Sequence, residues 1–173
     1  TTGSAMMLDR EEFLRGMRRV ANSVTVVTTG GPCGRHGATV SAFCSVSADP
    51  PSVLVCLHGS SRIAAMVRHN GTFCVNVLNE SAKSIADRFA GRTGLPCQDR
   101  FSGLRLVTSR HPSPILGLAA TAFSCDIAES MQHGTHLIVV GRVVAVANTE
   151  ANPLTYLNGR YSAISEPHVV NRS

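Results

Sequence analysis

Residues 38–51 read ATVSAFCSVSADPP and carry the strongest structural signal in the chain. Successive side chains on a strand point to opposite faces of the sheet. One face would therefore carry a row dominated by hydroxyls: Thr39, Ser41, Phe43, Ser45 and Ser47. Serine fits a pleated sheet poorly, so three serines in register need a reason beyond strand formation. Small hydroxyls let a ligand approach the backbone and offer it uncharged donors; the alternative is the solvated face of an antiparallel strand.

Turn-forming residues on both sides separate this strand from its neighbours. Neither Pro50 nor Pro51 can donate to a sheet ladder, so the strand stops at this point. Before it, GGPCGRHG at 30–37 is a turn that follows a strand at 23–29, SVTVVTT. Apolar runs predict further strands at 53–57, 73–78, 104–107, 115–127, 137–147 and 161–164.

Helical signals fall between groups of strands. Asp9 and Glu12 form a capping signature for a first helix that ends near Asn22. Further helices are expected after Ser60–Ser61, from a cap at Asn79 to Gly91, and at 153–157. Regular strand–helix alternation is missing, and short turns join adjacent strands. This pattern predicts antiparallel pairing, in a barrel or sandwich with peripheral helices.

Length and composition predict one domain at residues 8–165. Residues 1–7 resemble the remnant of an expression tag, and residues 166–173 are expected to form a C-terminal tail. No apolar run approaches 18 residues, so no transmembrane helix is expected. The formal charge of +5 comes from dispersed basic residues, and aromatic residues are 5% of the chain. This balance argues against a nucleic-acid binder and favours attraction of phosphorylated small molecules.

Several common catalytic and metal sites do not match the sequence. GGPCGRHG is not GxGxxG and opens no helix, Lys83 follows no glycine-rich loop, and no GxSxG is present. His133 and His136 form an HxxH motif on an expected turn without a third ligand, so no metal site is predicted. The six cysteines include no CxxC pair, which predicts a reducing, cytoplasmic setting.

Small polar groups remain at strand ends and helix starts. Ser60, Ser61 and Arg62 combine hydroxyls, free N–H groups and a guanidinium, which suits a phosphate, although a serine there also simply caps a helix. The helix ending at 88–91 offers either a ligand contact or a C-cap with a core phenylalanine. His136 precedes an apolar strand, where a lone histidine is commonly structural.

The order of these motifs resembles the flavin reductase family that forms the small component of two-component flavin-dependent monooxygenases. Examples are the reductases of 4-hydroxyphenylacetate and phenol hydroxylases. The resemblance runs from about residue 8 to 164. Its most specific string is T-x-S-A-x-x-S-x-S-x-D-P-P at 39–51, supported by FAG at 89–91, DRF at 99–101 and H-x-x-x-x-G-R-V at 136–143. It implies a mainly β fold with flanking helices, a Greek-key antiparallel split β-barrel, and a homodimer with flavin at or near the dimer interface.

The resemblance also implies which residues contact the cofactors. The flavin ring and ribityl chain are expected at Thr39, Val40, Ser41 and Ala42, with Ser45 and Ser47 toward the phosphate. The ribityl phosphate is expected at His58, Ser60, Ser61 and Arg62, and the adjoining helix end at Arg88, Phe89 and Ala90. The cleft shared by flavin and nicotinamide is expected beside Asp99, Arg100 and Phe101. Arg160 and Tyr161 are expected to form the wall of this cleft on the nicotinamide side. His136 is the expected catalytic residue, orienting the nicotinamide or lending a proton to reduced flavin.

The function implied is that of an NAD(P)H:flavin oxidoreductase, which transfers hydride from NADH to FAD or FMN and supplies reduced flavin to a partner monooxygenase. His58 stands where many relatives carry Asn, and Ile63 where Thr is frequent, which leaves FMN and FAD both open. No arginine cluster is evident for a 2′-phosphate, which favours NADH without excluding NADPH.

Two other functions fit the same barrel. One is a flavoprotein that stores or senses flavin without nicotinamide activity; His136 and Arg160–Tyr161 favour the enzyme over it, because a mere flavin binder needs no nicotinamide side. The other is an oxidase of a phosphorylated vitamin such as pyridoxamine phosphate. The chain lacks a concentrated basic set for the second phosphate that this substrate requires.

Overall fold

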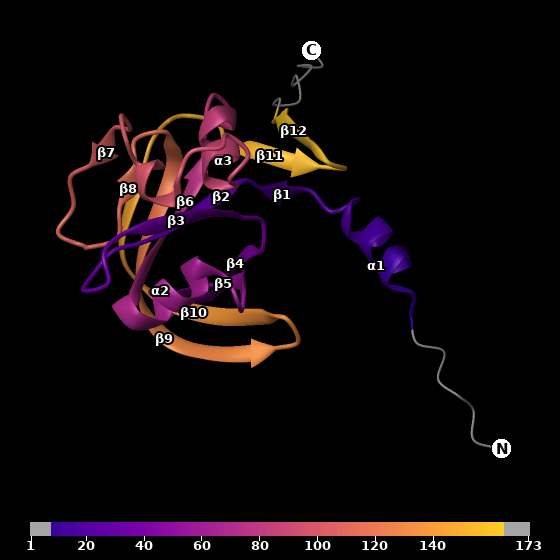
Figure 1. Ribbon diagram of the computed structural model, residues 1–173, viewed down its shortest axis with the longest axis horizontal. Coiled ribbons are helices and arrows are strands. Elements are labelled where there is room, and N and C mark those ends of the chain that lie inside the picture. The colour runs from indigo at the N-terminus through magenta and orange to yellow at the C-terminus, as the bar shows by residue number, and fades with distance from the viewer. Residues whose placement is uncertain (1–7, 165–173) are drawn as a thin grey trace, which may run out of the picture.

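The computed structural model describes residues 8–164 (Figure 1). Residues 1–7 and 165–173 lie outside the described residues, so the N-terminal remnant, the tail expected at 166–173 and the domain limits stay predictions. None of the helices within 8–164 is long and apolar enough to cross a membrane.

One seven-stranded sheet dominates the fold, and every neighbouring pair in it is antiparallel. Its strand order is β3-β2-β6-β9-β10-β5-β4. The strands are β2 (Thr25–Thr29), β3 (His36–Val40), β4 (Phe43–Ala48), β5 (Pro51–His58), β6 (Thr72–Leu78), β9 (Ala119–His133) and β10 (His136–Asn148). The expected antiparallel, mainly β architecture is confirmed.

The two edges of this sheet come together at Ser41 and Ala42. β3 and β4 are the first and last strands of the sheet, yet only these two residues separate them along the chain. Three Cα steps span at most about 11 Å, so the sheet curls until its edges approach each other. The Cys56 N–H donates to the Ala42 carbonyl at 3.0 Å and fixes this point against β5. Residues 41–42 therefore form the seam of a barrel-like sheet.

The expectation of one continuous strand through residues 38–47 is wrong. The backbone leaves the ladder at residues 41–42, and a register shift follows between Ser45 and Ser47. Residues 39, 41, 43, 45 and 47 therefore do not all lie on one face of the sheet, because each irregularity changes the side to which later residues point. Phe43 packs partly into the core, whereas the serines of β4 are exposed.

Smaller sheets and helices surround the main sheet. A three-stranded sheet joins β1 (Asn22–Ser23), β11 (Leu154–Leu157) and β12 (Arg160–Ala163), and a short pair joins β7 (Leu106–Val107) and β8 (Ile115–Leu116). The helices are α1 (Arg10–Met17), α2 (Arg62–Asn70), α3 (Lys83–Phe89) and the 3₁₀ turn η1 (Cys97–Asp99). The helix predicted at 153–157 is wrong: this segment is strand β11, because it finds partners in β1 and β12.

Two helix boundaries also differ from expectation. Asp9 caps α1 as predicted, accepting from the Glu11 N–H, but the helix ends at Met17 and not near Asn22. Asn79 does not cap α3; its carboxamide oxygen accepts from Ser81, and the cap position is Ala82. Local hydrogen bonding of Asn79 thus competes with the cap that the pattern suggested. Ser61 caps α2 as expected, accepting from the Ala64 N–H.

Two apolar clusters lie on opposite faces of the main sheet's β2 strand. Val27 belongs to the cluster that also includes Ile63 and Val67 of α2, and Val26 belongs to the cluster that includes Phe89 of α3. All five residues of β2 are buried, because helices cover both of its faces. Gly141 lets β10 pass the Phe73 ring, since a Cβ there would lie 2.4 Å from Phe73 Cζ.

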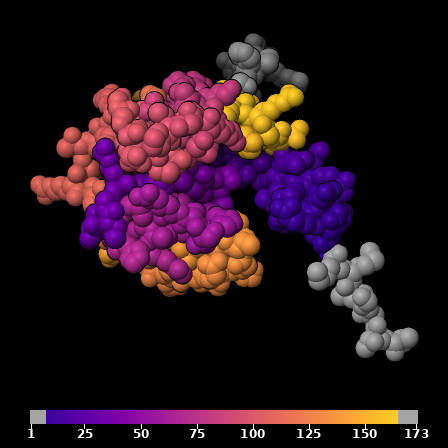
Figure 2. All heavy atoms as spheres, in the orientation of Figure 1, coloured from indigo at the N-terminus to yellow at the C-terminus, as the bar shows by residue number. Residues whose placement is uncertain are grey.

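Helix α1 stands out from this body. It has no buried residue, and Phe13 and Met17 are each about half exposed. Figures 1 and 2 show α1 as a separate lobe next to the β11–β12 hairpin, with a notch between it and the rest of the molecule. The Asn158 N–H of that hairpin donates to the Arg18 carbonyl at 2.9 Å and anchors the helix end.

Candidate functional site

A first cleft of about 290 Å³ opens at the seam between β3 and β4. It brings together seven of the predicted site residues: Thr39, Val40, Ser41, Ala42, His58, Ser61 and His136. Segments far apart in sequence meet here because β10 pairs with β5 in a register that places His136 opposite His58. The remaining lining residues are Ala38, Cys56, Leu57 and Ile63. The cleft therefore combines small and apolar side chains with hydroxyl groups and two imidazole rings.

The seam supplies hydrogen-bond donors to this cleft. Within residues 8–164, the backbone N–H groups of Ser41 and Ala42 donate to no other part of the chain. The Thr39 hydroxyl is already committed, because it donates to the Ala86 carbonyl of α3 at 2.6 Å. Of the predicted row of hydroxyl groups, only the Ser41 hydroxyl stays available at the seam. The backbone N–H groups of Ser41 and Ala42 are two further donors.

Two histidine rings border the other side of the first cleft. The His58 and His136 ring centroids lie 5.5 Å apart in an edge-to-face arrangement. His58 Nδ1 bonds the Ser60 hydroxyl at 3.0 Å, and His136 Nδ1 bonds the Thr135 hydroxyl at 2.9 Å. Each hydroxyl orients its ring and leaves Nε2 without a partner in the described part of the chain. The described residues hold no group of three or more metal-ligating side chains.

A second cleft of about 190 Å³ also borders the seam. It shares Thr39, Val40 and Ser41 with the first cleft and adds Ala90 and Tyr161 from the predicted set. Its other lining residues are Ser23, Val24, Arg92 and Tyr156. Tyr156 was not predicted as a site residue, because residues 153–157 were expected to be helical. Strand β11 places its ring in the wall of this cleft.

A small polar network fixes the far wall of the second cleft. The Tyr161 hydroxyl donates to Asp87 Oδ1 at 3.0 Å, and Arg92 Nη1 reaches the same oxygen at 3.0 Å. Burial raises the pKa of Tyr161, and its hydrogen bond to Asp87 raises that pKa further. Tyr161 also packs edge-to-face on Tyr156, with ring centroids 5.5 Å apart. The ring of Tyr161 is therefore held rigidly as a neutral aromatic wall.

The remaining predicted residues line neither cleft. They are Ser45, Ser47, Ser60, Arg62, Arg88, Phe89, Arg100, Phe101 and Arg160. Ser47 serves the β4–β5 turn, where its hydroxyl bonds the backbone of Asp49. Arg88 donates to the Ser102 carbonyl, and Arg100 to the Phe89 carbonyl. Direct contact of these residues with a cofactor stays a prediction.

Phe89 and Phe101 belong to the core. Their rings pack edge-to-face, with centroids 5.1 Å apart, and both side chains are buried. Phe89 also fills the space beside Gly37 of β3, where a Cβ would lie 2.7 Å from the ring. The pair thus supports the strand that leads into the seam.

His36 lies at the start of β3 and was not anticipated as a site residue. It is buried, and its pKa falls to about 4, first because burial disfavours the charged ring and then because of the positive charges of Arg62 and Arg100. These two arginines come from separate segments that the sequence pattern had already singled out. Their shared influence on His36 shows that both positive charges act on the start of β3.

The depressed pKa of His36 predicts a loss of stability in acid. The unfolded chain takes up this proton near pH 6.5, whereas the folded chain resists it until about pH 4. Stability from this group is therefore complete above pH 6.5 and is lost as the pH falls toward 4, at up to about 1.4 kcal/mol per pH unit. Urea unfolding of wild type and His36→Leu between pH 4 and 7 measures the difference. The same slope in both, with His69→Leu as the exposed control, would contradict the assignment.

Cysteine chemistry in the described structure is that of free thiols. All six cysteines are unpaired, as the absence of a CxxC motif led us to expect. Cys74 and Cys125 are buried, and burial raises the pKa of each thiol to about 12. Cys44, by contrast, is exposed, because it lies on the outer part of β4. The buried thiols therefore behave as small apolar side chains.

Comparison with known proteins identifies the family. The model of the flavin reductase like domain matches residues 17–165. Among curated proteins, the chain is 40% identical to an FMN reductase (NADH), RutF, from Ancylobacter novellus over 162 residues. That match covers 93% of this chain and 88% of the relative.

Solved structures show the same fold. The NADH:FAD oxidoreductase SgcE6 of Streptomyces globisporus, in complex with NAD and FAD fragments, superposes with a TM-score of 0.82 at 26% identity, covering 93% of this chain and 98% of that one. The styrene monooxygenase flavin reductase (SMOB) of Pseudomonas putida S12 gives a TM-score of 0.78 at 29% identity, covering 90% and 98%. The expected split-barrel fold is confirmed. With its family match, its 40% identical relative and this shared fold, the chain belongs to the flavin reductase family.

Proposed function

We propose that this protein is an NADH:flavin oxidoreductase that supplies reduced flavin to a separate oxygenase. The observation that carries the proposal is the first cleft, where the β3–β4 seam faces His58 and His136. The comparisons support it, because the relatives are named as FMN reductase and NADH:FAD oxidoreductase, and one neighbour is the flavin reductase of a monooxygenase.

The residues at the seam fit a flavin. An isoalloxazine ring needs a flat, largely apolar wall with a few donors for its pyrimidine edge. Ala38, Val40 and Ala42 supply small apolar surface, and the free N–H groups of Ser41 and Ala42 supply donors close to the backbone. Larger side chains at these positions would hold the ring away from the backbone. The fit therefore comes from small residues at a point where the ladder is interrupted.

The chain's own residues have a positioning role in the proposed reaction. When bound, the cofactors supply the hydride transfer itself, from nicotinamide C4 to flavin N5. The seam and the rigid Tyr156–Tyr161 wall would restrict the orientation of the two rings, which lowers the entropic part of the barrier. The N–H groups of Ser41 and Ala42 would stabilise negative charge that develops at the pyrimidine edge.

His136 is the residue that the proposal assigns to the nicotinamide side. Its ring is oriented through Nδ1 by Thr135, which leaves Nε2 for a substrate group or a proton. His136→Ala is expected to lower kcat/KM for NADH by about tenfold, the effect of losing one hydrogen bond to the nicotinamide side. Steady-state kinetics at several NADH concentrations measure this. Full activity with an unchanged KM would remove His136 from the reaction, and His133→Ala on the neighbouring strand is the matched control.

The proposal includes a homodimer. Its support is the amphipathic helix α1, which buries none of its residues and leaves the Phe13 side chain about half exposed. Such exposed apolar side chains are commonly covered in an assembly. Sedimentation equilibrium of wild type and Phe13→Glu tests it, with a dimer expected for wild type and dissociation for the variant. The six free thiols support the proposed cytoplasmic setting, where thiols stay reduced.

The direct test of the reductase is the decay of NADH absorbance at 340 nm with added flavin. Rapid oxidation with FMN or FAD is expected. Tight flavin binding without NADH oxidation would support the storage protein instead. Crossing NADH and NADPH with FMN, FAD and riboflavin decides which pair the enzyme uses.

A further inference from the structure

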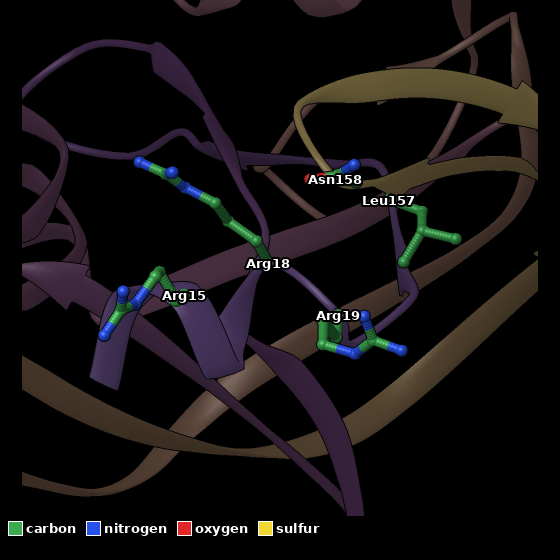
Figure 3. Close-up of a pocket in the computed structure, with 5 residues that line it drawn as sticks. All are labelled: Arg15, Arg18, Arg19, Leu157 and Asn158. Atoms are coloured by element: carbon green, nitrogen blue, oxygen red, sulfur yellow. The ribbon is translucent and has the colours of Figure 1, made fainter. Parts of the chain in front are cut away.

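A third pocket lies apart from the two clefts at the seam. Its volume is about 480 Å³, within the range of about 300–1,000 Å³ typical of small-molecule sites. It is lined by Arg15, Arg18 and Arg19 from the end of α1 and by Leu157 and Asn158 from the β11–β12 hairpin (Figure 3). In Figure 3 the guanidinium groups of Arg15 and Arg18 extend toward the same side, and that of Arg19 lies nearer Leu157. We call these three side chains the arginine cluster.

The charges of the arginine cluster are not neutralised by the part of the chain that the structure describes. All the ion pairs found within residues 8–164 involve other groups. Glu11 and Glu12 precede Arg15 by one helical turn, but neither carboxylate comes within 4.0 Å of it. Three guanidinium groups without ion-pair partners line this one pocket, and an anion bound there would be attracted by all three charges. Guanidinium forks match phosphate oxygens in geometry as well as charge.

An intermediate cleft adjoins both the arginine cluster and the seam, because it shares lining residues with each. This intermediate cleft of about 260 Å³ shares Arg18 and Asn158 with the arginine pocket. The same intermediate cleft shares Ser41 and Tyr156 with the second cleft. Ser41 also lines the first cleft. A long ligand could therefore extend from the seam to the arginine cluster along one surface of the chain.

We propose that the arginine cluster binds the adenosine diphosphate half of a dinucleotide whose other half lies at the seam. The inference rests on the proposed function, and it names the part of the substrate that this function leaves unassigned. FAD and NADH both carry such a half, whereas FMN does not. The diphosphate would meet the guanidinium groups, and the intermediate cleft, with Leu14 and Met17 on its walls, would take apolar parts of the ligand.

The ligand chemistry favours a diphosphate over a single carboxylate or monophosphate. Three arginines offer more donors than one phosphate group can accept, and each charge-assisted hydrogen bond adds to the affinity. The pocket also lies at the C-terminal end of α1, whose dipole disfavours anions. Several guanidinium groups are therefore needed to outweigh the helix end, and a more highly charged ligand gains most from them.

Binding of ADP, measured by calorimetry at fixed ionic strength, tests the site without any enzymatic turnover. Arg15→Ala and Arg19→Ala are each expected to weaken ADP binding about tenfold, the factor for one hydrogen bond to a charged group. Arg10→Ala is the matched control, because Arg10 lies on the same helix and carries the same charge but lines none of the pockets described above. All three arginines are exposed, so thermal unfolding should be unchanged.

Kinetics then distinguish the two sources of the ADP group. A raised KM for FAD with an unchanged KM for FMN assigns the cluster to the flavin dinucleotide. A raised KM for NADH with an unchanged KM for reduced nicotinamide mononucleotide assigns it to the nicotinamide dinucleotide. Either result supports the proposal.

The proposal is overturned by wild-type ADP affinity in the Arg15→Ala/Arg19→Ala double variant, or by unchanged KM values for both dinucleotides. In that case the arginines would be left as a contact for an acidic protein surface. Failure of the reductase itself would look different: wild type would then oxidise no NADH with any flavin, while its ADP affinity could still be measured.

Discussion

Replacing Ser41 by phenylalanine is expected to abolish most of the activity while leaving the fold intact. Ser41 lines both clefts at the seam and the intermediate cleft that adjoins the arginine cluster. A phenyl ring there would fill the surface on which the flavin is proposed to lie. We expect kcat/KM to fall at least about 100-fold, which corresponds to ~2.7 kcal/mol of transition-state stabilisation. Because Ser41 is exposed, the melting temperature should change little.

Ser41→Ala separates the effect of bulk from that of the hydroxyl. It removes one donor and keeps the space, so the expected loss is less than about tenfold. The measurement is NADH oxidation at saturating and limiting flavin, with flavin affinity from fluorescence quenching. Wild-type kinetics in Ser41→Phe would place the flavin elsewhere on the molecule. Equal losses in both variants would make the hydroxyl, and not the open space, the essential feature.

Replacing Phe89 by alanine is expected to give the largest loss of stability. The ring is buried against Phe101 and against Gly37 of β3. Removing a buried phenylalanine ring costs about 3–5 kcal/mol, through lost burial and the cavity that remains. In a domain of this size the melting temperature falls by roughly 2–4 °C for each kcal/mol. The expected decrease is therefore about 6–20 °C, measured by calorimetry.

Phe89→Leu keeps most of the volume and should lose clearly less stability than Phe89→Ala. The pair of variants also tests the role of Phe89 at the site. If the ring only supports β3, flavin affinity at low temperature stays close to wild type wherever the variant is folded. A fall in flavin affinity in Phe89→Leu, with little change in stability, would instead show direct contact with the cofactor.

Much of the local structure could be predicted from sequence. The cap at Asp9, the cap at Ser61 and the turn at Pro50 rest on interactions within a few residues, and each is found in the structure. Two of the errors have different causes, one from distant strand pairing and one from a local hydrogen bond. The segment 153–157 has no strong pattern of its own and becomes a strand only because β1 and β12 flank it. The Asn79 carboxamide oxygen accepts hydrogen bonds from Ser81 in a local turn, so Asn79 does not cap the helix.

The candidate site was predictable in part. Residues 39–42, His58 and His136 were singled out from sequence, and the structure brings them to one cleft. The contributions of Tyr156 and of the arginine cluster were missed, since neither belongs to a recognisable motif. From the sequence, no arginine cluster was evident for a 2′-phosphate, and the shared pocket of Arg15, Arg18 and Arg19 was not anticipated. Their convergence depends on where α1 meets the β11–β12 hairpin, and periodicity does not encode that position.

The sequence by itself determined the strand and turn signals, the antiparallel fold class and the family to which the chain belongs. These follow from side-chain periodicity, turn residues and the string at 39–51, all of which act over short distances. Only the tertiary structure decided that β3 and β4 meet as opposite edges of one sheet, and that Ser41 lies at their seam. The physical reason is that hydrogen bonding between distant strands sets the curl of the sheet. That curl interrupts the row of hydroxyl groups. The Thr39 hydroxyl bonds to α3, the Ser47 hydroxyl bonds within the β4–β5 turn, and Ser41 lines the clefts.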